Sequence, residues 1–283
     1  MTAARPTTPA DRTRDDLPRV LELPEPGVPP RAVRPGAGAW IALTVAEARM
    51  VARDTAGLVI PLGMPLLVLV MNGLAPGLDE VVPGAGGRTF LDVYVIPLTL
   101  TMVVATVGVI NMPSFLAYYR RTGVLKRLGV TPASPAMVLG AQAFVGVAQI
   151  LLGIALALGV AVVWLGASPP VDPWAAAGVL VLTIAAMYAG GMLVAAVSPT
   201  PGSAVAIGLV AFFALGALGG MFGSRENLPD ALATLGGWLP FGAAVDALGA
   251  AWAGLAVPGS ALVGLAASTV VAGVAAAVWF RWE

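Results

Sequence analysis

The sequence lacks histidine and cysteine altogether, although it is 283 residues long. Without cysteine there are no disulfide bonds and no thiolate nucleophiles. Without histidine there are no imidazole metal ligands, no imidazole proton relays and no Ser-His-Asp triad. A G-x-x-x-x-G-K-[ST] segment is also missing, so the chain has no P-loop to hold nucleotide phosphates. We therefore expect a protein that is not an enzyme, with no catalytic residue, no metal site and no cofactor bound by this chain.

Charged residues are scarce as well. Asp, Glu, Lys and Arg make up 11% of the chain and hydrophobic residues 58%, whereas about a quarter of a typical soluble domain is charged. So few charges cannot cover the surface of a soluble domain of this size. The composition therefore predicts an all-α polytopic membrane protein, because helices satisfy their own backbone hydrogen bonds within a bilayer.

Six apolar runs are long enough to cross a membrane, which takes about 20 helical residues. No charged residue occurs within 136–171 or within 173–224, and one Arg or Asp at the centre of a span would cost about 2.5–3.5 kcal/mol on insertion. This pattern favours six transmembrane helices over a soluble bundle with a large buried core. The predicted spans are at about 56–75, 92–117, 136–166, 174–198, 202–223 and 257–280.

The start of the chain differs in composition. Residues 1–37 are rich in proline and arginine and contain no apolar run of the ~7–15 residues that a secretory signal needs, so we expect a disordered cytoplasmic tail. Residues 40–54 mix Trp40 and aliphatic residues with Glu47, Arg49 and Arg53. This mixture predicts a helix in the membrane interface, with Trp40 at headgroup depth. The alternative is a plain cytoplasmic extension of the first span.

The basic residues indicate the orientation. Thirteen of the 15 Lys and Arg precede the first span, lie between the second and third spans or follow the last span, and only Arg88 and Arg225 lie on the other side. Basic residues concentrate in cytoplasmic loops, so both termini and the loop 118–135 are predicted to be cytoplasmic. The excess of Arg over Lys, with abundant Ala, Gly and Val, is typical of a GC-rich bacterium, so we expect a bacterial cell membrane.

Residues 228–256 allow two interpretations. They are apolar enough for a seventh span, but they contain Pro240, Asp246 and the paired glycines Gly236 and Gly237. A seventh crossing would also place Arg281 on the outer side. We favour a broken, re-entrant segment that enters from the outside and turns back, which is tolerated where protein or a watery cavity covers it.

The loop between the second and third spans is a candidate site for docking a cytoplasmic motor. It reads YYRRTGVLKRLGVTPASP over 118–135, and a short helix over 124–128 would place apolar side chains on one side with basic residues around it. Prolines would end this helix and start the next element. An ordinary positive-inside loop is the alternative. The candidate coupling residues are Arg120, Arg121, Gly123, Leu125, Lys126, Arg127, Leu128, Thr131 and Pro132.

Two further sets of residues are candidates for helix packing and for a translocation path. Small residues four apart let helices approach closely, and the fifth span offers the pairs Gly216 with Gly220 and Gly219 with Gly223. Polar and aromatic residues near the span ends would line a path or gate, although core packing or lipid contact is the alternative for each. This set comprises Asn111, Phe115, Phe212, Phe213, Met221, Phe222, Pro240 and Phe241.

These features together resemble the membrane subunit (permease) of type-2 ATP-binding-cassette exporters, over about residues 38–282. The interfacial helix precedes the first span, and residues 121–132 read RTGVLKRLGVTP, close to the family pattern R-x-G-x-L-(K/R)-R-L-x-x-(T/S)-P. The fifth span ends GGMF at 219–222, followed by ENLP at 226–229, LPF at 239–241 and VDAL at 245–248. Two positions depart from the pattern: Arg120 and Arg121 stand where many members carry Glu, and Gly249 stands where many carry Arg.

The resemblance implies a complex in which this chain does no bond chemistry. Two permease subunits, identical or a pair of sister chains, would enclose a path, and two separate ATPase subunits would bind ATP and Mg below them. The loop 118–135 would be the coupling helix, spans two and five would flank the dimer interface, and the re-entrant segment would form the outer gate. A path without fixed charge suits a hydrophobic or amphipathic compound, such as a drug, an antibiotic or a lipid, better than an ion. Membrane lipid is an expected partner and nucleic acid is not.

Two functions of other classes remain as alternatives. A membrane scaffold would bind a cytoplasmic partner through the Pro-rich tail, and deletion of residues 1–35 would then abolish that binding while leaving any transport intact. A passive channel would conduct without ATP or a partner.

Overall fold

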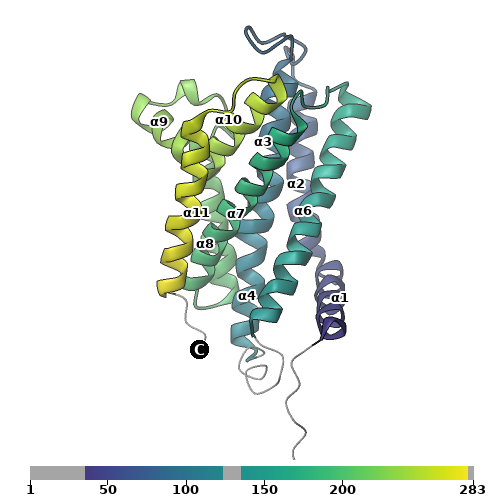
Figure 1. The fold of residues 1–283 in the computed structure, drawn as a ribbon, viewed down its shortest axis with the longest axis vertical. Coiled ribbons are helices and arrows are strands. Elements are labelled where there is room, and N and C mark those ends of the chain that lie inside the picture. Colours follow the sequence, from purple (N-terminus) through teal and green to yellow (C-terminus); the bar gives the residue numbers. More distant parts are fainter. Residues whose placement is uncertain (1–35, 124–134, 280–283) are drawn as a thin grey trace, which may run out of the picture. The chain divides into compact units, whose positions relative to one another are not determined.

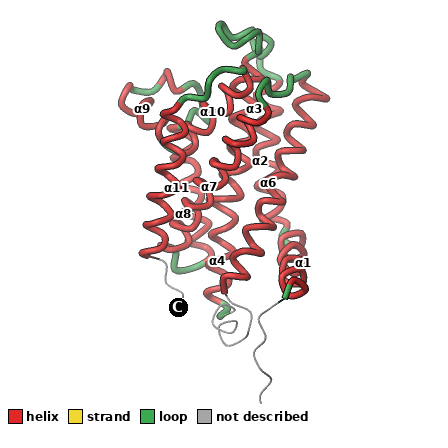
Figure 2. Tube along the Cα trace, viewed as in Figure 1, coloured by secondary structure: helices red, strands yellow, loops and turns green. Residues whose placement is uncertain are grey.

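The structure is a computed structural model that describes residues 36–123 and 135–279. Within these residues the chain is helical, and the only strand-like feature is an isolated bridge between Val81 and Thr89. Figures 1 and 2 show long helices side by side, with turns at both ends of the bundle. The all-α prediction is confirmed. Residues 1–35 of the predicted tail (1–37) and most of the loop motif lie outside the described residues, and the last residue of that range, Ala37, already begins a helix.

Six of the described helices are long and apolar enough to span a membrane, which confirms the predicted number. Span two is continuous but changes its helix type along its length. The elements are α1 (Ala37–Arg53), α2 (Thr55–Gly73), span two with η4 (Leu91–Val95), α3 (Ile96–Ala105), η5 (Thr106–Asn111) and α4 (Met112–Arg121), then α6 (Pro135–Leu165), α7 (Pro173–Val197), α8 (Pro201–Leu218), η6 (Arg225–Asn227), α9 (Asp230–Trp238), α10 (Pro240–Ala253) and α11 (Gly259–Trp279).

Local chemistry sets the helix boundaries. The Asp54 carboxylate accepts the Gly57 N–H at 3.1 Å, so the same residue ends α1 and caps α2. Asp172 caps α7 by accepting the Ala175 N–H, and Thr200 and Ser203 form a capping box at α8. Helices α7, α8 and α10 also start with proline, which needs no N–H acceptor in the first turn.

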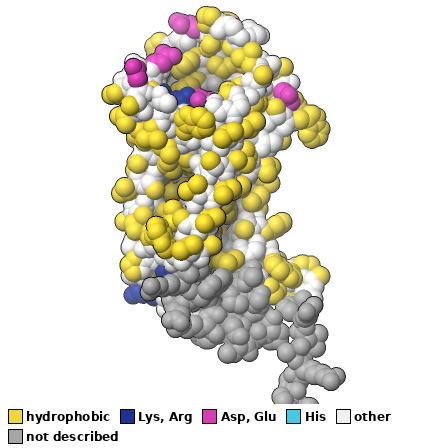
Figure 3. Space-filling view, turned by 60° about the vertical axis from the view of Figure 1, so that its left-hand side comes forward, with side chains coloured by type: hydrophobic (Ala, Val, Ile, Leu, Met, Phe, Trp, Pro, Cys, Tyr) yellow, Lys and Arg dark blue, Asp and Glu magenta, His cyan; other side chains and the backbone are white. Residues whose placement is uncertain are grey.

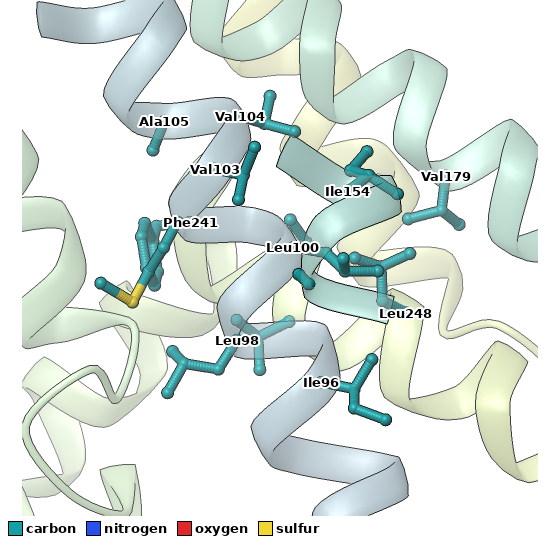
Figure 4. Close-up of a cluster of buried hydrophobic side chains, with 14 of the residues drawn as sticks. Ile96, Leu98, Leu100, Val103, Val104, Ala105, Ile154, Val179, Phe241 and Leu248 are labelled. Atoms are coloured by element: carbon teal, nitrogen blue, oxygen red, sulfur yellow. The ribbon is translucent and has the colours of Figure 1, made fainter. Parts of the chain in front are cut away.

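Span two is the central helix of the bundle. In its most apolar stretch 89% of the residues are buried, compared with 22% in α2, α8 and α11. Every residue of α3 and η5 is buried. Figure 4 shows part of this core, in which side chains of α3 lie among those of α6, α7 and α10, namely Leu98, Leu100, Val103, Ile154, Val179, Phe241 and Leu248.

Glycines bring α7 and α8 against the backbone of span two at η5. A Cβ atom on Gly191 of α7 would stand 1.9 Å from the Gly108 carbonyl oxygen, and one on Gly208 of α8 would stand 2.6 Å from the Val109 carbonyl oxygen. No side chain fits at either position. The π-helical segment η5 therefore belongs to the closest-packed parts of span two, and π-helical turns are frequent at functional sites.

The stretch between α8 and α11 is bent. Helices α9 and α10 meet at a bend of 76°. Leu239 is extended there, as expected for a residue before a proline. Figure 1 shows that α8 arrives and α11 departs at the same end of the bundle, where α9 and α10 also lie. This arrangement agrees with the re-entrant interpretation, and the bent pair is the one place where a seventh crossing could be counted among the described residues. We call this end the re-entrant end, and the opposite end, where α1 and the last turn of α4 lie, the loop end.

Helix α8 ends at Leu218, five residues before the predicted end of the fifth span. Gly219 leaves the helical conformation, and Gly220 has φ of +97°, a left-handed conformation that favours glycine. The Met221 N–H turns back to the Gly216 carbonyl. The chain therefore leaves α8 in a tight turn, and the segment that follows lies across the re-entrant end.

Candidate functional site

The loop end holds the described part of the predicted coupling segment. The Arg120 guanidinium donates to the Ser198 carbonyl, which ties the last turn of α4 to the C-terminus of α7. Arg121 is exposed, and Gly123 has φ of +67°, so the chain turns sharply out of the helix. Both arginines line a cavity of about 810 Å³ beside the turn between α7 and α8. The remaining predicted coupling residues, Leu125, Lys126, Arg127, Leu128, Thr131 and Pro132, lie outside the described residues.

A buried carboxylate joins α1 to the same turn of α4. Glu47 is 5% exposed, and the Tyr119 hydroxyl donates to its Oε2 at 2.5 Å. Burial raises the pKa of Glu47 above its usual value, and the Tyr119 hydrogen bond opposes part of this rise. Tyr119 immediately precedes Arg120, so α1 contacts the start of the loop motif. In the sequence, Glu47 was only one polar residue in a mixed helix.

Two prolines explain the neutral polar side chains near this end of the bundle. Pro61 and Pro65 have no N–H, so the carbonyls of Gly57 and Pro61 lose their helical donors within α2. Asn111 Nδ2 donates to the Gly57 carbonyl at 2.6 Å and Gln149 Nε2 at 2.8 Å.

The second freed carbonyl, that of Pro61, has a donor in span two. Thr106 Oγ1 lies 3.3 Å from it, and the single hydroxyl proton is shared between this carbonyl and the Met102 and Val103 carbonyls of its own helix. Span two and α6 thus supply the hydrogen bonds that α2 cannot make internally, as a lipid environment requires.

The same residues line a notch between α2 and α8. Its volume is about 130 Å³, and span two forms its floor with Thr106, Ile110 and Asn111. Val205 lines it from α8, and Ile60 lines it from α2. Most of span two is covered by other helices of the same chain. At the notch, part of it is open to the side of the bundle. Of the predicted path residues, Asn111 lies here.

The predicted aromatic path residues divide into two groups. Phe115 is buried in a cluster with Val51 of α1 and Val145 of α6. It is distant in sequence from the re-entrant segment. The others gather where α8 meets α10. The second group comprises Phe212, Phe213, Met221, Phe222, Pro240 and Phe241.

Within this group only two side chains face outward. Phe213 is 41% exposed and Phe222 70% exposed, and their rings stack with centroids 6.2 Å apart. Phe212 and Phe241 are fully buried in an edge-to-face pair. Met221 is 9% exposed. The exposed aromatic surface formed by Phe213 and Phe222 therefore lies over the buried pair of Phe212 and Phe241.

The predicted packing glycines serve the turn after α8. A Cβ on Gly219 would stand 2.5 Å from the Phe241 ring, and one on Gly216 2.9 Å from the Met221 side chain. A Cβ on Gly220 would stand 2.5 Å from the Tyr94 hydroxyl. Gly223, with φ of +144°, has open space around it. Since α8 ends at Leu218, these residues do not share one helical face, and the close approach they allow is to α10 and to span two.

Span two is also fastened at the re-entrant end. The Tyr94 hydroxyl donates to the Gly220 carbonyl at 2.7 Å. The Asp92 carboxylate accepts the Ser168 N–H at 2.8 Å and lies 3.9 Å from Arg88. The helix that ends in the loop motif is thus bonded, at its other end, to the turns that follow α6 and α8.

Comparison with known proteins supports a transporter subunit. A search of the curated proteins finds no match to this chain. The family model described as ABC-2 type transporter matches residues 38–251, which is more than half of the chain and includes the interfacial helix, spans one to five and most of the re-entrant segment. The chain therefore belongs to the ABC-2 type transporter family, as a multi-pass membrane component of an ABC transporter.

Proposed function

We propose that this chain is the permease of an ATP-driven exporter in a bacterial cytoplasmic membrane, with both termini and the loop 118–135 in the cytoplasm. Two copies, or this chain and a sister chain, would enclose the path. Two ATPase subunits would bind ATP and Mg and dock on the loop. This chain would supply no catalytic group. The family match and the described charges support this arrangement, because Arg49, Arg53, Arg120 and Arg121 all lie at the loop end.

The observation that carries the proposal is the position of span two. It runs buried from the loop motif at one end to the re-entrant segment at the other, and it is bonded to neighbouring elements at both ends. A force applied to the loop would therefore reach α7 through Arg120, α1 through Tyr119 and the turn after α8 through Tyr94. This continuity suits a subunit whose energy comes from a partner at the loop end.

The exposed faces of α2 and α8 are the proposed walls of the path. These two helices flank the notch over span two and are among the least buried spans in the single copy. The notch is polar at Asn111 and at Asp54, which caps α2, whereas Phe213 of α8 and Phe222 of the turn after it form an aromatic surface. Apart from Asp54, this wall carries no charged side chain, and it would accept a hydrophobic or amphipathic compound, such as a drug, an antibiotic or a lipid.

Substitution of the loop tests the proposal. Leu125→Asp with Leu128→Asp is expected to abolish co-purification with the ATPase and ATP-dependent export, while the chain still inserts into the membrane. Val81→Asp is the matched control, because Val81 is an exposed apolar residue (59%) at the opposite end, and it should leave both properties intact. If the loop variant still co-purified with the ATPase and exported substrate, the coupling role would be wrong.

A further inference from the structure

An ion pair fastens the re-entrant segment to the turn that follows α8. Arg225 of η6 is bonded to the Asp246 carboxylate of α10, and the two side chains are 22% and 34% exposed. Arg225 is the sole basic residue between 219 and 258 in the sequence, and Asp246 is the sole acidic residue between 231 and 258. The pair therefore joins the segment before α9 to α10, across the bend at Pro240, and it uses the one charged residue of α10.

Glycines make the room for this arginine. A Cβ on Gly237 would stand 3.3 Å from Arg225 Nη1 and 4.0 Å from an Asp246 carboxylate oxygen, with no other atom so near. A Cβ on Gly242 would stand 2.9 Å from the same Nη1, and 2.2 Å from the Gly236 carbonyl oxygen, so this glycine also allows α9 and α10 to approach closely. Both residues lie on the α9–α10 side of the pair. The re-entrant segment is thus shaped around the guanidinium group.

The pair also separates two hollows at the re-entrant end. One hollow, of about 340 Å³, is lined by Arg225, Trp238 and Ser260, and the other, of about 330 Å³, by Tyr94 and Gly249. Asp246 lines both. Figure 3 shows a hollow at this end in which basic and acidic side chains are visible. Opening the pair would therefore remove part of the wall between the two hollows.

Span two reaches the pair through Tyr94. The Tyr94 hydroxyl donates to the Gly220 carbonyl, and Gly220 lacks the Cβ that would collide with it. Tyr94 lines one hollow together with Asp246. Movement of span two would therefore reach the turn at Gly220, five residues before Arg225, through the Tyr94 hydrogen bond.

The energetics of the pair suit reversible opening. Ions that leave water lose hydration, so a partly buried ion pair is close to balanced between its two states. In addition, Arg225 Nη1 is buried and has no hydrogen-bond partner among the described residues, and such an unsatisfied donor favours the open, hydrated state. The ion pair therefore favours the closed state, and the unsatisfied Arg225 Nη1 group favours the open state.

We propose that the Arg225–Asp246 pair is a latch that keeps the re-entrant segment closed over the interior of the bundle, with Tyr94 as its link to span two. The two charged residues are positioning residues, because they act by holding α10 in place. The proposal rests on the proposed function in that the segment is the outer gate, and it names the contact by which that gate is held shut.

The absence of native cysteine gives a direct test. Ala243 lies on α10 one turn before Asp246 and is fully buried, so Ala243→Cys introduces a single thiol behind the latch. The full chain, reconstituted in lipid nanodiscs, is treated with a membrane-impermeant maleimide. Slow labelling is expected in the parent. Arg225→Gln with Asp246→Asn should raise the labelling rate about tenfold, because the rate follows the population of the open form.

The double substitution removes both charges and so leaves no unpaired charge in the protein. Arg88→Gln with Asp92→Asn is the matched control, since it removes both charges of the other ion pair of the described residues at this end and should leave the labelling rate unchanged. An unchanged rate in the folded double variant, or an equal rise in the control, would overturn the latch. The assay needs neither ATPase nor substrate, so its failure is distinct from a failure of the loop substitutions, which concern the proposed function alone.

Discussion

At the scale of single residues, proline accounts for the buried amide side chains that bond to α2. Pro61 removes the donor of the Gly57 carbonyl, and Asn111 and Gln149 replace it from two other spans. In the sequence Asn111 looks like a candidate for a substrate path. The structure shows that both amides bond to α2, and Asn111 also lines the notch. Asn111 therefore both stabilises α2 and lines the notch.

Removal of both amide donors tests this explanation. Asn111→Leu with Gln149→Met should destabilise the chain by about 1–3 kcal/mol, because a buried carbonyl then has no donor. The same double change in a Pro61→Ala background should cost much less, since an alanine at that position would supply the missing N–H. Thermal unfolding midpoints in detergent would measure both costs. Equal costs in the two backgrounds would contradict the explanation.

Glu47 makes stability depend on pH. Burial raises the pKa of its carboxyl in the folded protein, so the folded state binds a proton more tightly than the unfolded state. This contribution is fully present below the unfolded pKa of about 4.5 and is lost as pH rises through the folded pKa. Stability should therefore fall as pH rises above about 4.5.

Glu47→Gln should remove that fall and be more stable than the parent at neutral pH, because Gln cannot ionise and its amide oxygen still accepts the Tyr119 hydrogen bond. Thermal midpoints across this pH range would show it, with the exposed Glu80→Gln as the control that keeps the parent's pH profile. A profile for Glu47→Gln that parallels the parent would refute the assignment.

At the scale of elements, the closest helix contacts lie at η5. Gly190 and Gly191 are neighbours in α7, but a methyl on Gly191 meets the Gly108 carbonyl oxygen at 1.9 Å and one on Gly190 meets nothing within 4 Å. Gly191→Ala should therefore push α7 from span two and cost about 1–3 kcal/mol. Gly190→Ala should be neutral or stabilise by about 0.5–1 kcal/mol, because alanine favours the helix. Unfolding midpoints of the two variants make the comparison, and similar losses in both would contradict the packing argument.

These elements also show what the sequence can and cannot predict. Apolar length and the lack of charge predict all six spans, and Pro240 with the paired glycines predicts the bend of the re-entrant segment. The packing glycines were harder to predict, because 35 glycines make small-residue spacings common. The spacing pointed to 216–223, whereas the helix contacts at span two use Gly108, Gly191 and Gly208. Pairings between distant residues, such as Glu47 with Tyr119, depend on tertiary packing and leave no local signal.

At the scale of the whole bundle, charge separates the two ends. Among the described residues, four of the six arginines lie at the loop end, and seven of the nine carboxylates lie at the re-entrant end. Figure 3 shows acidic side chains at the re-entrant end and hydrophobic side chains along the bundle. Basic residues remain in the cytoplasm during insertion. The loop end, where an ATPase would dock, is therefore predicted to face the cytoplasm, and the latch to face outward.

Single cysteines in this cysteine-free chain can establish the orientation. Glu80→Cys lies in the exposed turn at the re-entrant end, and Arg121→Cys lies at the end of α4. In intact cells a membrane-impermeant maleimide should label the first and not the second, and permeabilised cells should show labelling of both. The unsubstituted chain is the control and should not be labelled at all. Labelling of Arg121→Cys alone in intact cells would mean that the chain has the reverse orientation. The ATP-dependent partner and the proposed latch would then lie on the wrong sides of the membrane for export.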